Sequence, residues 1–150
     1  GTDSVVEANQ VRRFVKGHKH YSVYALSESI SKKELAQSLE FLKTHLKENP
    51  RDGVKLFGVL TSQVRRLLLV KYFLNERLSE TEIFSKLRIH PFLGRQLLQN
   101  TKGFTLTELE NIQVYLAEID LSIKFQQQHV RPHFQNLLEK ICLGNFSSAV

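Results

Sequence analysis

The sequence has few of the residues and segments that mark secreted or membrane proteins. It contains one cysteine, Cys142, so no disulfide can form within the chain and the fold needs no oxidising compartment. No apolar run approaches the roughly 20 residues that a membrane-spanning helix needs. The first residues do not show the basic and then apolar pattern of a signal peptide. These absences predict a cytoplasmic protein with no membrane partner.

Glycine and proline are scarce as well, with seven and three residues among 150. A β-sandwich needs many tight turns and therefore more of both residues, whereas helices joined by short connections do not. The apolar fraction of 41% is that of an ordinary globular domain, and a chain of this length can bury a core of its own. The sequence therefore predicts an all-α fold, a helical bundle.

Motifs for catalysis and cofactor binding are missing too. The sequence has no GxxxxGKS/T phosphate loop and no HExxH zinc motif. His129 and His133 have the four-residue spacing of metal ligands on a helix, but Pro132 lies between them, which favours surface histidines. Cys142 beside a histidine would form a nucleophile pair, yet a cysteine in the apolar stripe of a helix is typically a small core residue. We expect no catalytic residue, no metal and no cofactor.

Apolar residues recur at helical spacing along most of the chain. Ser31, Ser79 and Thr105 each precede a glutamate by three residues, the pattern of a capping box, and predict three helix starts. His90-Pro91 separates two further helices. Asn49-Pro50 is expected to open the longest helix, over residues 50–76. The last helix is expected to follow Pro132. The predicted inward stripes comprise Leu35, Leu39, Leu42, Leu46, Phe57, Leu60, Val64, Leu109, Ile112, Leu116, Ile119, Ile123, Phe134, Leu137, Leu138 and Ile141.

A break near the N-terminus divides the predicted elements. Residues 4–16 have helical spacing, and Gly17 through His20 interrupt it, with Gly17 at the position that favours positive φ after a helix. We interpret residues 1–19 as the end of a preceding helical domain and a linker. Residues 20–150 are predicted to form one bundle of about six helices.

The second half of the longest predicted helix is apolar on nearly all sides from Leu67 to Leu74. A helix of this kind is either buried or in contact with a partner. We expect more apolar helical surface than a lone bundle can cover, and therefore binding to other proteins.

The formal charge of +6 suits an acidic partner or nucleic acid, or serves solubility alone. Arg65 and Arg66 on the longest helix are expected to form a subunit contact or an intramolecular pair rather than to bind DNA. A basic cluster near the N-terminus is either a DNA contact or a solvated linker. It comprises Arg12, Arg13, Lys16 and Lys19. This cluster motivates an alternative function as a free-standing, basic, helical nucleic-acid-binding domain.

Several segments together resemble the collar region of the delta subunit family of bacterial DNA polymerase III clamp loaders. Residues 63–71 resemble the long-helix motif of that collar domain, and residues 120–124 resemble a motif on its penultimate helix. Residues 78–83 followed by His90-Pro91-Phe92 are similar to the family's intervening segment. Residues 23–30 resemble the start of the collar, and residues 5–15 the last helix of the preceding lid-like domain. Arg77 and Arg88 depart from the family by standing where glycine is common.

The resemblance implies an assembly domain of DNA polymerase III, a nucleotidyltransferase, rather than a catalytic unit. Its implied partners are the gamma/tau and delta-prime subunits, with the sliding clamp and DNA contacted through the complete protein. The clamp-contacting part of this family lies N-terminal to the region matched here. We expect the assembly face to include parts of the 50–76 helix and the last two helices. The subunit-interface candidates are Arg65, Arg66, Leu69, Lys71, Tyr72 and Phe73.

Overall fold

Seven helices and no strand make up the described part of this computed structural model, residues 18–126 and 129–147. They are α2 (His18–Ser31), α3 (Leu35–Glu48), α4 (Gly53–Asn75), α5 (Glu80–Leu87), α6 (Pro91–Thr101), α7 (Leu106–Gln126) and α8 (Val130–Cys142). The predicted all-α fold is confirmed, with one helix more than the six or so expected from residue 20 on. The helix expected over residues 4–16 lies outside the described residues.

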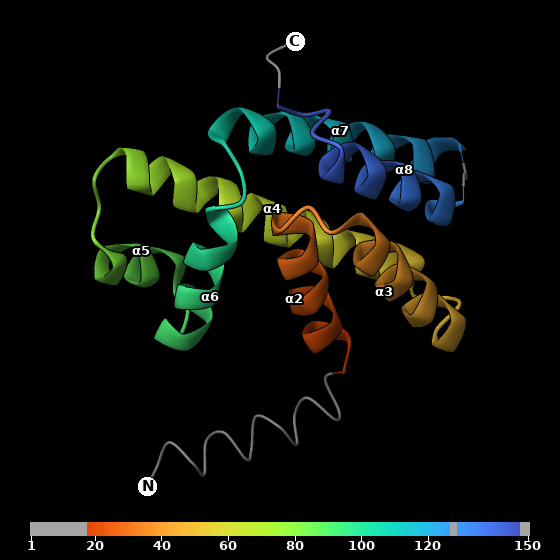
Figure 1. The fold of residues 1–150 in the computed structure, drawn as a ribbon, viewed down its shortest axis with the longest axis horizontal. Helices are drawn as coiled ribbons and strands as arrows, with labels where there is room; N and C mark the ends of the chain where they lie inside the picture. The colour runs from red at the N-terminus through yellow and green to blue at the C-terminus, as the bar shows by residue number, and fades with distance from the viewer. Residues whose placement is uncertain (1–17, 127–128, 148–150) are drawn as a thin grey trace, which may run out of the picture.

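The longest helix, α4, lies at the centre of the bundle. It packs against α2, α5, α6, α7 and α8. Figure 1 shows α7 and α8 side by side above it, with α5 and α6 below its C-terminal half and α2 and α3 below its N-terminal half. The two ends of α4 therefore lie in different surroundings, and each borders a surface described below.

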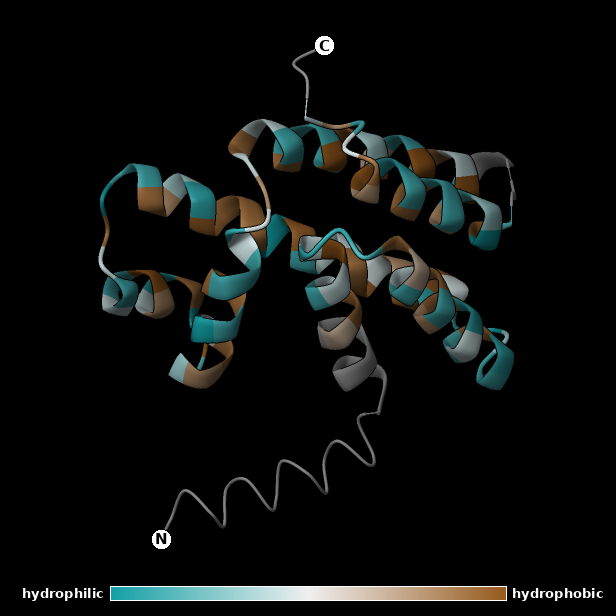
Figure 2. Cartoon of the chain, in the orientation of Figure 1, coloured by the Kyte–Doolittle hydropathy of each residue, from teal (hydrophilic) through white to brown (hydrophobic). Residues whose placement is uncertain are grey.

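The core is built from the inward stripes of amphipathic helices. Figure 2 shows hydrophobic and hydrophilic residues alternating along the helices, as amphipathic packing requires. Phe134 of α8 is fully buried, and its ring meets that of Phe57 of α4 edge to face, with the centroids 5.8 Å apart. All the predicted stripe residues are buried except Leu35, Leu39 and Ile123, which are partly buried against the core. The sequence periodicity therefore predicted the core faces correctly.

Two of the three predicted capping boxes are confirmed. The Ser79 hydroxyl accepts a hydrogen bond from the Glu82 N–H at 3.2 Å, at the start of α5. At the start of α7 the box is complete, since Thr105 Oγ1 accepts from the Glu108 N–H and Glu108 Oε1 accepts from the Thr105 N–H. These bonds satisfy amide groups that have no partner within the helix. His90 caps α6 as expected, with Pro91 in its first turn.

The third capping box, at Ser31, was predicted wrongly. Helix α2 continues to Ser31, whose hydroxyl donates to the Glu28 carbonyl instead of capping α3. Lys33 then takes a left-handed conformation, with φ of 59°, and α3 begins after Glu34 without a side-chain cap. The backbone N–H of Glu34 reaches back to the Ser29 carbonyl. The turn is therefore built as a C-terminal cap of α2, which removes Ser31 from the role that its sequence pattern suggested.

Three helix starts also differ from the prediction. Helix α4 begins at Gly53 rather than Pro50, because Asn49 closes α3 with its backbone N–H and its side-chain amide both donating to the His45 carbonyl. Helix α8 begins at Val130, two residues before Pro132, which is tolerated in a first turn where amides lack helical partners. Helix α2 begins at His18, so His18–His20 are helical rather than part of a break.

The two departures from the family pattern fall on unusual backbone. Arg77 and Arg88 have φ angles of 62° and 53°, in the left-handed region where glycine is favoured. Arg88 closes α5, and its backbone N–H bonds to the helix end. An arginine in this conformation costs free energy relative to glycine but leaves the turn intact.

A buried polar contact ties the α2–α3 turn to the start of α7. Lys33 Nζ lies 2.7 Å from Glu108 Oε2 and 4.3 Å from the centre of the Phe104 ring. A Cβ atom at Gly103 would overlap the carbonyl oxygen of Ser31, so the two turns touch through backbone. We call this region, formed by Ser31, Lys33, Gly103, Phe104 and Glu108, the turn junction.

Candidate functional site

The C-terminal half of α4 combines core residues with bare apolar residues. Leu67 and Val70 are 4% and 1% exposed and belong to the core. Leu69, Tyr72 and Leu74 are exposed by 37%, 39% and 41%. The chain thus does not enclose this apolar segment, and the expected surplus of apolar surface is present on the described part of the fold.

Three of the six interface candidates share one face of α4. Arg65, Leu69 and Tyr72 are separated by four and three residues, which places them on one line along a helix. All three are exposed. The Arg65 guanidinium forms no ion pair with any described residue. We call these three residues the α4 outer face, an apolar strip with a cation at its N-terminal end.

The other three candidates lie elsewhere on the helix. Arg66 and Phe73 are rotated by about 100° from the outer face, since successive residues in a helix turn by that amount. Arg66 is exposed, whereas Phe73 is half-buried and lies 5.9 Å from Lys86 Nζ, measured to the ring centre. Lys71 is half-buried on the opposite flank. The structure therefore groups half of the predicted set and separates the rest.

The DNA-contact candidates fall mostly outside the described residues. Arg12, Arg13 and Lys16 precede residue 18, where the description begins. Lys19 lies in the first turn of α2, but its side chain is not among those described. Contact of this cluster with DNA stays a prediction.

The sequence reasoning missed a second apolar strip, on α7. Val114 and Leu121 are exposed by 60% and 56%, and Ala117 lies between them on the same helix face. The exposed carboxylates of Glu110 and Glu118 border this strip. Its signal was present in the sequence as a second set of apolar residues at helical spacing, opposite the core stripe Leu109, Ile112, Leu116 and Ile119. We call Val114, Ala117 and Leu121 the α7 strip.

The titratable groups of the described chain provide little for chemistry. Burial raises the pKa of the Cys142 thiol above its ordinary value, which keeps it protonated and a poor nucleophile. No group of three or more His, Cys, Asp or Glu side chains has metal-binding geometry within the residues described. Asp120 and Lys124 form the predicted exposed pair, 2.9 Å apart on α7. None of the helices that the structure describes is long and apolar enough to cross a bilayer.

Comparison with known proteins gives relatives for most of the chain. Residues 20–141 match the family model described as DNA polymerase III delta subunit, C-terminal domain. The chain is 25% identical over 124 residues to the DNA polymerase III subunit delta of Bacillus subtilis strain 168. This match covers 83% of the chain but only 35% of that protein, so the chain spans about a third of the relative's length.

The fold has a counterpart among solved structures. The structure described as the Bacillus subtilis DNA clamp loader delta protein superimposes with a TM-score of 0.75. The similarity covers 81% of this chain and 36% of the other, at 24% identity, and it supports the fold. The family match carries the assignment, since it spans more than half of the sequence, including the whole of α3 through α7. The chain belongs to the family of the C-terminal domain of the DNA polymerase III delta subunit.

Proposed function

We propose that this chain is the C-terminal part of a DNA polymerase III delta subunit and assembles the clamp loader that places the sliding clamp on DNA. It does so by binding sister subunits through helix faces. The family match supports the identity of the domain. The bare apolar surface on α4 supports a role in assembly, since a chain acting alone would gain by covering Leu69 and Tyr72. That exposed surface is the observation that carries the proposal.

The two apolar strips suit a subunit with a neighbour on each side. A subunit within a ring presents two different faces, one to each neighbour. The α4 outer face carries Arg65, and the α7 strip is bordered by Glu110 and Glu118. Opposite charges around similar apolar strips favour head-to-tail docking between related domains, because complementary potentials fix the orientation of the partners. Helices α4 and α7 therefore present the two assembly faces.

The partners follow from the family. Sister subunits of the gamma/tau and delta-prime kinds bind these faces, and the sliding clamp and DNA are reached through the complete protein. The chain itself contributes no catalytic group to DNA polymerase III, in line with the protonated Cys142 and the lack of a clustered metal site within the described residues. Assembly takes place in the cytoplasm, where the chromosome is replicated.

Co-elution with the other clamp-loader subunits tests the proposal. The chain is mixed with those subunits purified from the same organism and analysed by size exclusion with light scattering. We expect a complex with the parent chain and loss of that complex with the double variant Leu69→Gln/Tyr72→Gln. Glutamine removes the apolar contact while keeping helix propensity. No complex with any subunit would refute the assembly role.

Two matched variants locate the interface. Val114→Gln/Leu121→Gln removes the same kind of surface from the α7 strip, and Leu143→Gln removes an isolated apolar side chain that is 66% exposed. We expect the α7 variant to lose a different neighbour from the one lost by the α4 variant, and the Leu143 variant to retain both. Retention of all subunits by the α4 variant would show that the outer face of α4 is not an interface.

A further inference from the structure

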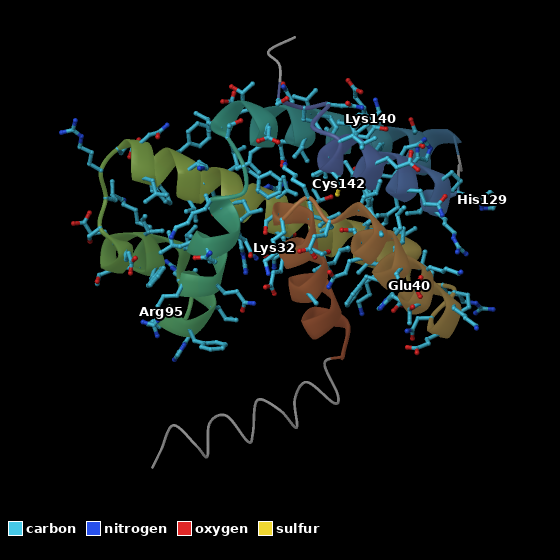
Figure 3. All side chains as sticks on the ribbon, in the orientation of Figure 1. Lys32, Glu40, Arg95, His129, Lys140 and Cys142 are labelled. Carbon is cyan, nitrogen blue, oxygen red and sulfur yellow. The ribbon has the colours of Figure 1, made fainter. Side chains whose placement is uncertain are left out.

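We propose that the pocket between the starts of α4 and α8 binds a phosphate group. The pocket has a volume of about 330 Å³ and is lined from three helices and their preceding loops. Its charged lining consists of Arg51, His129 and Arg131. Arg51 comes from the α3–α4 loop, while His129 and Arg131 come from the start of α8. Figure 3 shows His129 at one extremity of the molecule, on the side of α8 and α3.

The positive charge of this pocket is not cancelled by its surroundings. No carboxylate lines it. Asp52 follows Arg51 directly, but its Oδ2 lies 3.4 Å from Nε2 of the buried His45 and is itself shielded from solvent. Arg51 and Arg131 are exposed and form no ion pair with a described residue. Two guanidinium groups without carboxylate partners at one pocket make a site for a small anion.

Backbone amides add to the same field. Helices α4 and α8 both begin at this pocket, where Gly53 approaches Val130 so closely that an added Cβ would lie 3.5 Å from the valine Cβ. Neither helix start has a side-chain cap, so its first amide groups are not occupied by Asp52 or His129 side chains. The arginines make the pocket cationic, and the helix ends supplement them with N–H donors and positive dipole ends.

A second pocket shows why the first is selective for anions. It lies between α5 and α6, has a volume of about 470 Å³, and is also lined by two arginines, Arg88 and Arg95. Glu80 lines it as well, and α5 is capped by the Ser79 hydroxyl. Figure 3 places Arg95 at the opposite end of the molecule from His129. Equal numbers of arginines in a partly neutralised pocket give a matched control.

The ligand is a phosphate, either free in solution or part of a nucleic-acid backbone. The site does not depend on subunit assembly, so its test is independent of the function proposed above. Inorganic phosphate is titrated into the isotope-labelled 150-residue chain by NMR, and a single-stranded oligodeoxynucleotide is titrated separately by fluorescence anisotropy. We expect saturable shifts of the Val54 and Arg131 amides with either ligand. If DNA is the source, affinity falls with salt, and Arg51→Gln/Arg131→Gln lowers the slope of log K against log salt by about 2, one for each lost phosphate contact.

The double variant Arg88→Gln/Arg95→Gln changes the net charge equally and serves as the control. We expect it to keep the phosphate shifts and the full salt slope. Saturation by phosphate together with no DNA affinity would assign the site to free phosphate. Equal loss of binding in both double variants, or unsaturable shifts spread over every basic surface, would overturn the proposal, because general attraction by net charge would then explain the binding. Unchanged phosphate shifts in Arg51→Gln/Arg131→Gln would overturn it too.

Discussion

The turn junction and the α4 outer face differ in how far the chain completes them. At the junction, Lys33 contacts both Glu108 and Phe104, and Glu108 also closes the capping box of α7. On the outer face, Leu69 and Tyr72 are more than one third exposed, and no described carboxylate pairs with Arg65. Polar satisfaction and burial together thus separate a surface that stabilises the fold from one that another protein can cover. Substitutions in the two regions should therefore affect stability very differently.

The largest effect is expected from removing the Phe104 side chain, which is 4% exposed beneath Lys33. Phe104→Ala should lower the free energy of unfolding by about 3–5 kcal/mol, because it removes buried apolar surface and leaves a cavity. Phe92→Ala is the control, since this ring is 58% exposed on α6. It should cost less than about 1 kcal/mol. Urea denaturation followed by circular dichroism measures both values, and similar losses would remove the distinction between junction and surface.

The next effect depends on pH. Burial by itself raises the pKa of Glu108, but hydrogen bonds from Lys33 and from the Thr105 N–H outweigh it and hold the pKa below the ordinary carboxyl value. The unfolded chain therefore takes up a proton first as the pH falls. The stabilisation by this carboxylate is present above the ordinary carboxyl pKa of about 4.3, and it is lost as the pH drops through the lowered value.

Lys33→Met tests the cause of that shift. Without the ammonium group, Glu108 keeps its burial but loses a partner, so the variant should be less stable at neutral pH by about 1–2 kcal/mol. Its stability should also fall less between neutral pH and pH values below the carboxyl range. Asp120→Asn at the exposed α7 pair serves as the control, with an expected change of a few tenths of a kcal/mol. Parallel pH profiles for the parent and Lys33→Met would contradict the assigned role of Lys33.

Left-handed residues give a comparison with opposite signs. Lys33 and Arg88 have nearly the same φ, 59° and 53°, but only Lys33 has its side chain in an ion pair within the described structure. Arg88→Gly should raise the free energy of unfolding by about 0.5–1 kcal/mol, since glycine adopts this conformation without strain. Lys33→Gly should lower it, because the lost contacts with Glu108 and Phe104 outweigh the relief of strain. Stabilisation by both substitutions would show that the junction contacts contribute little.

Local signals in the sequence predicted what local interactions determine. The boxes at Ser79 and Thr105 are correct because a hydroxyl and an amide three residues apart meet whenever a helix starts there. Ser31 has the same pattern and fails, because α2 continues through it and the chain turns at Lys33, where the ion pair with Glu108 lies. The competing contact comes from α7, far along the chain, and no window around Ser31 contains it.

The surfaces were predictable only in part, for the same reason. Helical spacing singled out the apolar end of α4, but it did not separate Leu69 from Leu67, since the packing of α4 against its neighbours decides which is covered. The phosphate pocket was missed entirely. Arg51 and Arg131 are distant in sequence and meet only because α4 and α8 start side by side. Such a site has no signature within either segment alone.

The smallest effect on stability is expected where the largest effect on assembly is proposed. Leu69→Gln/Tyr72→Gln should change the free energy of unfolding of the isolated chain by no more than about 0.5 kcal/mol, because both side chains are substantially exposed and glutamine is a good helix former. Leu67→Ala, a change to a 4% exposed neighbour, should cost about 2–5 kcal/mol. If the double variant unfolds as readily as Leu67→Ala, the outer face is part of the core in solution, and its loss of partner binding would report misfolding. If its stability is retained while sister subunits no longer co-elute, the free energy lost belongs to the interface, since the fold itself has not changed.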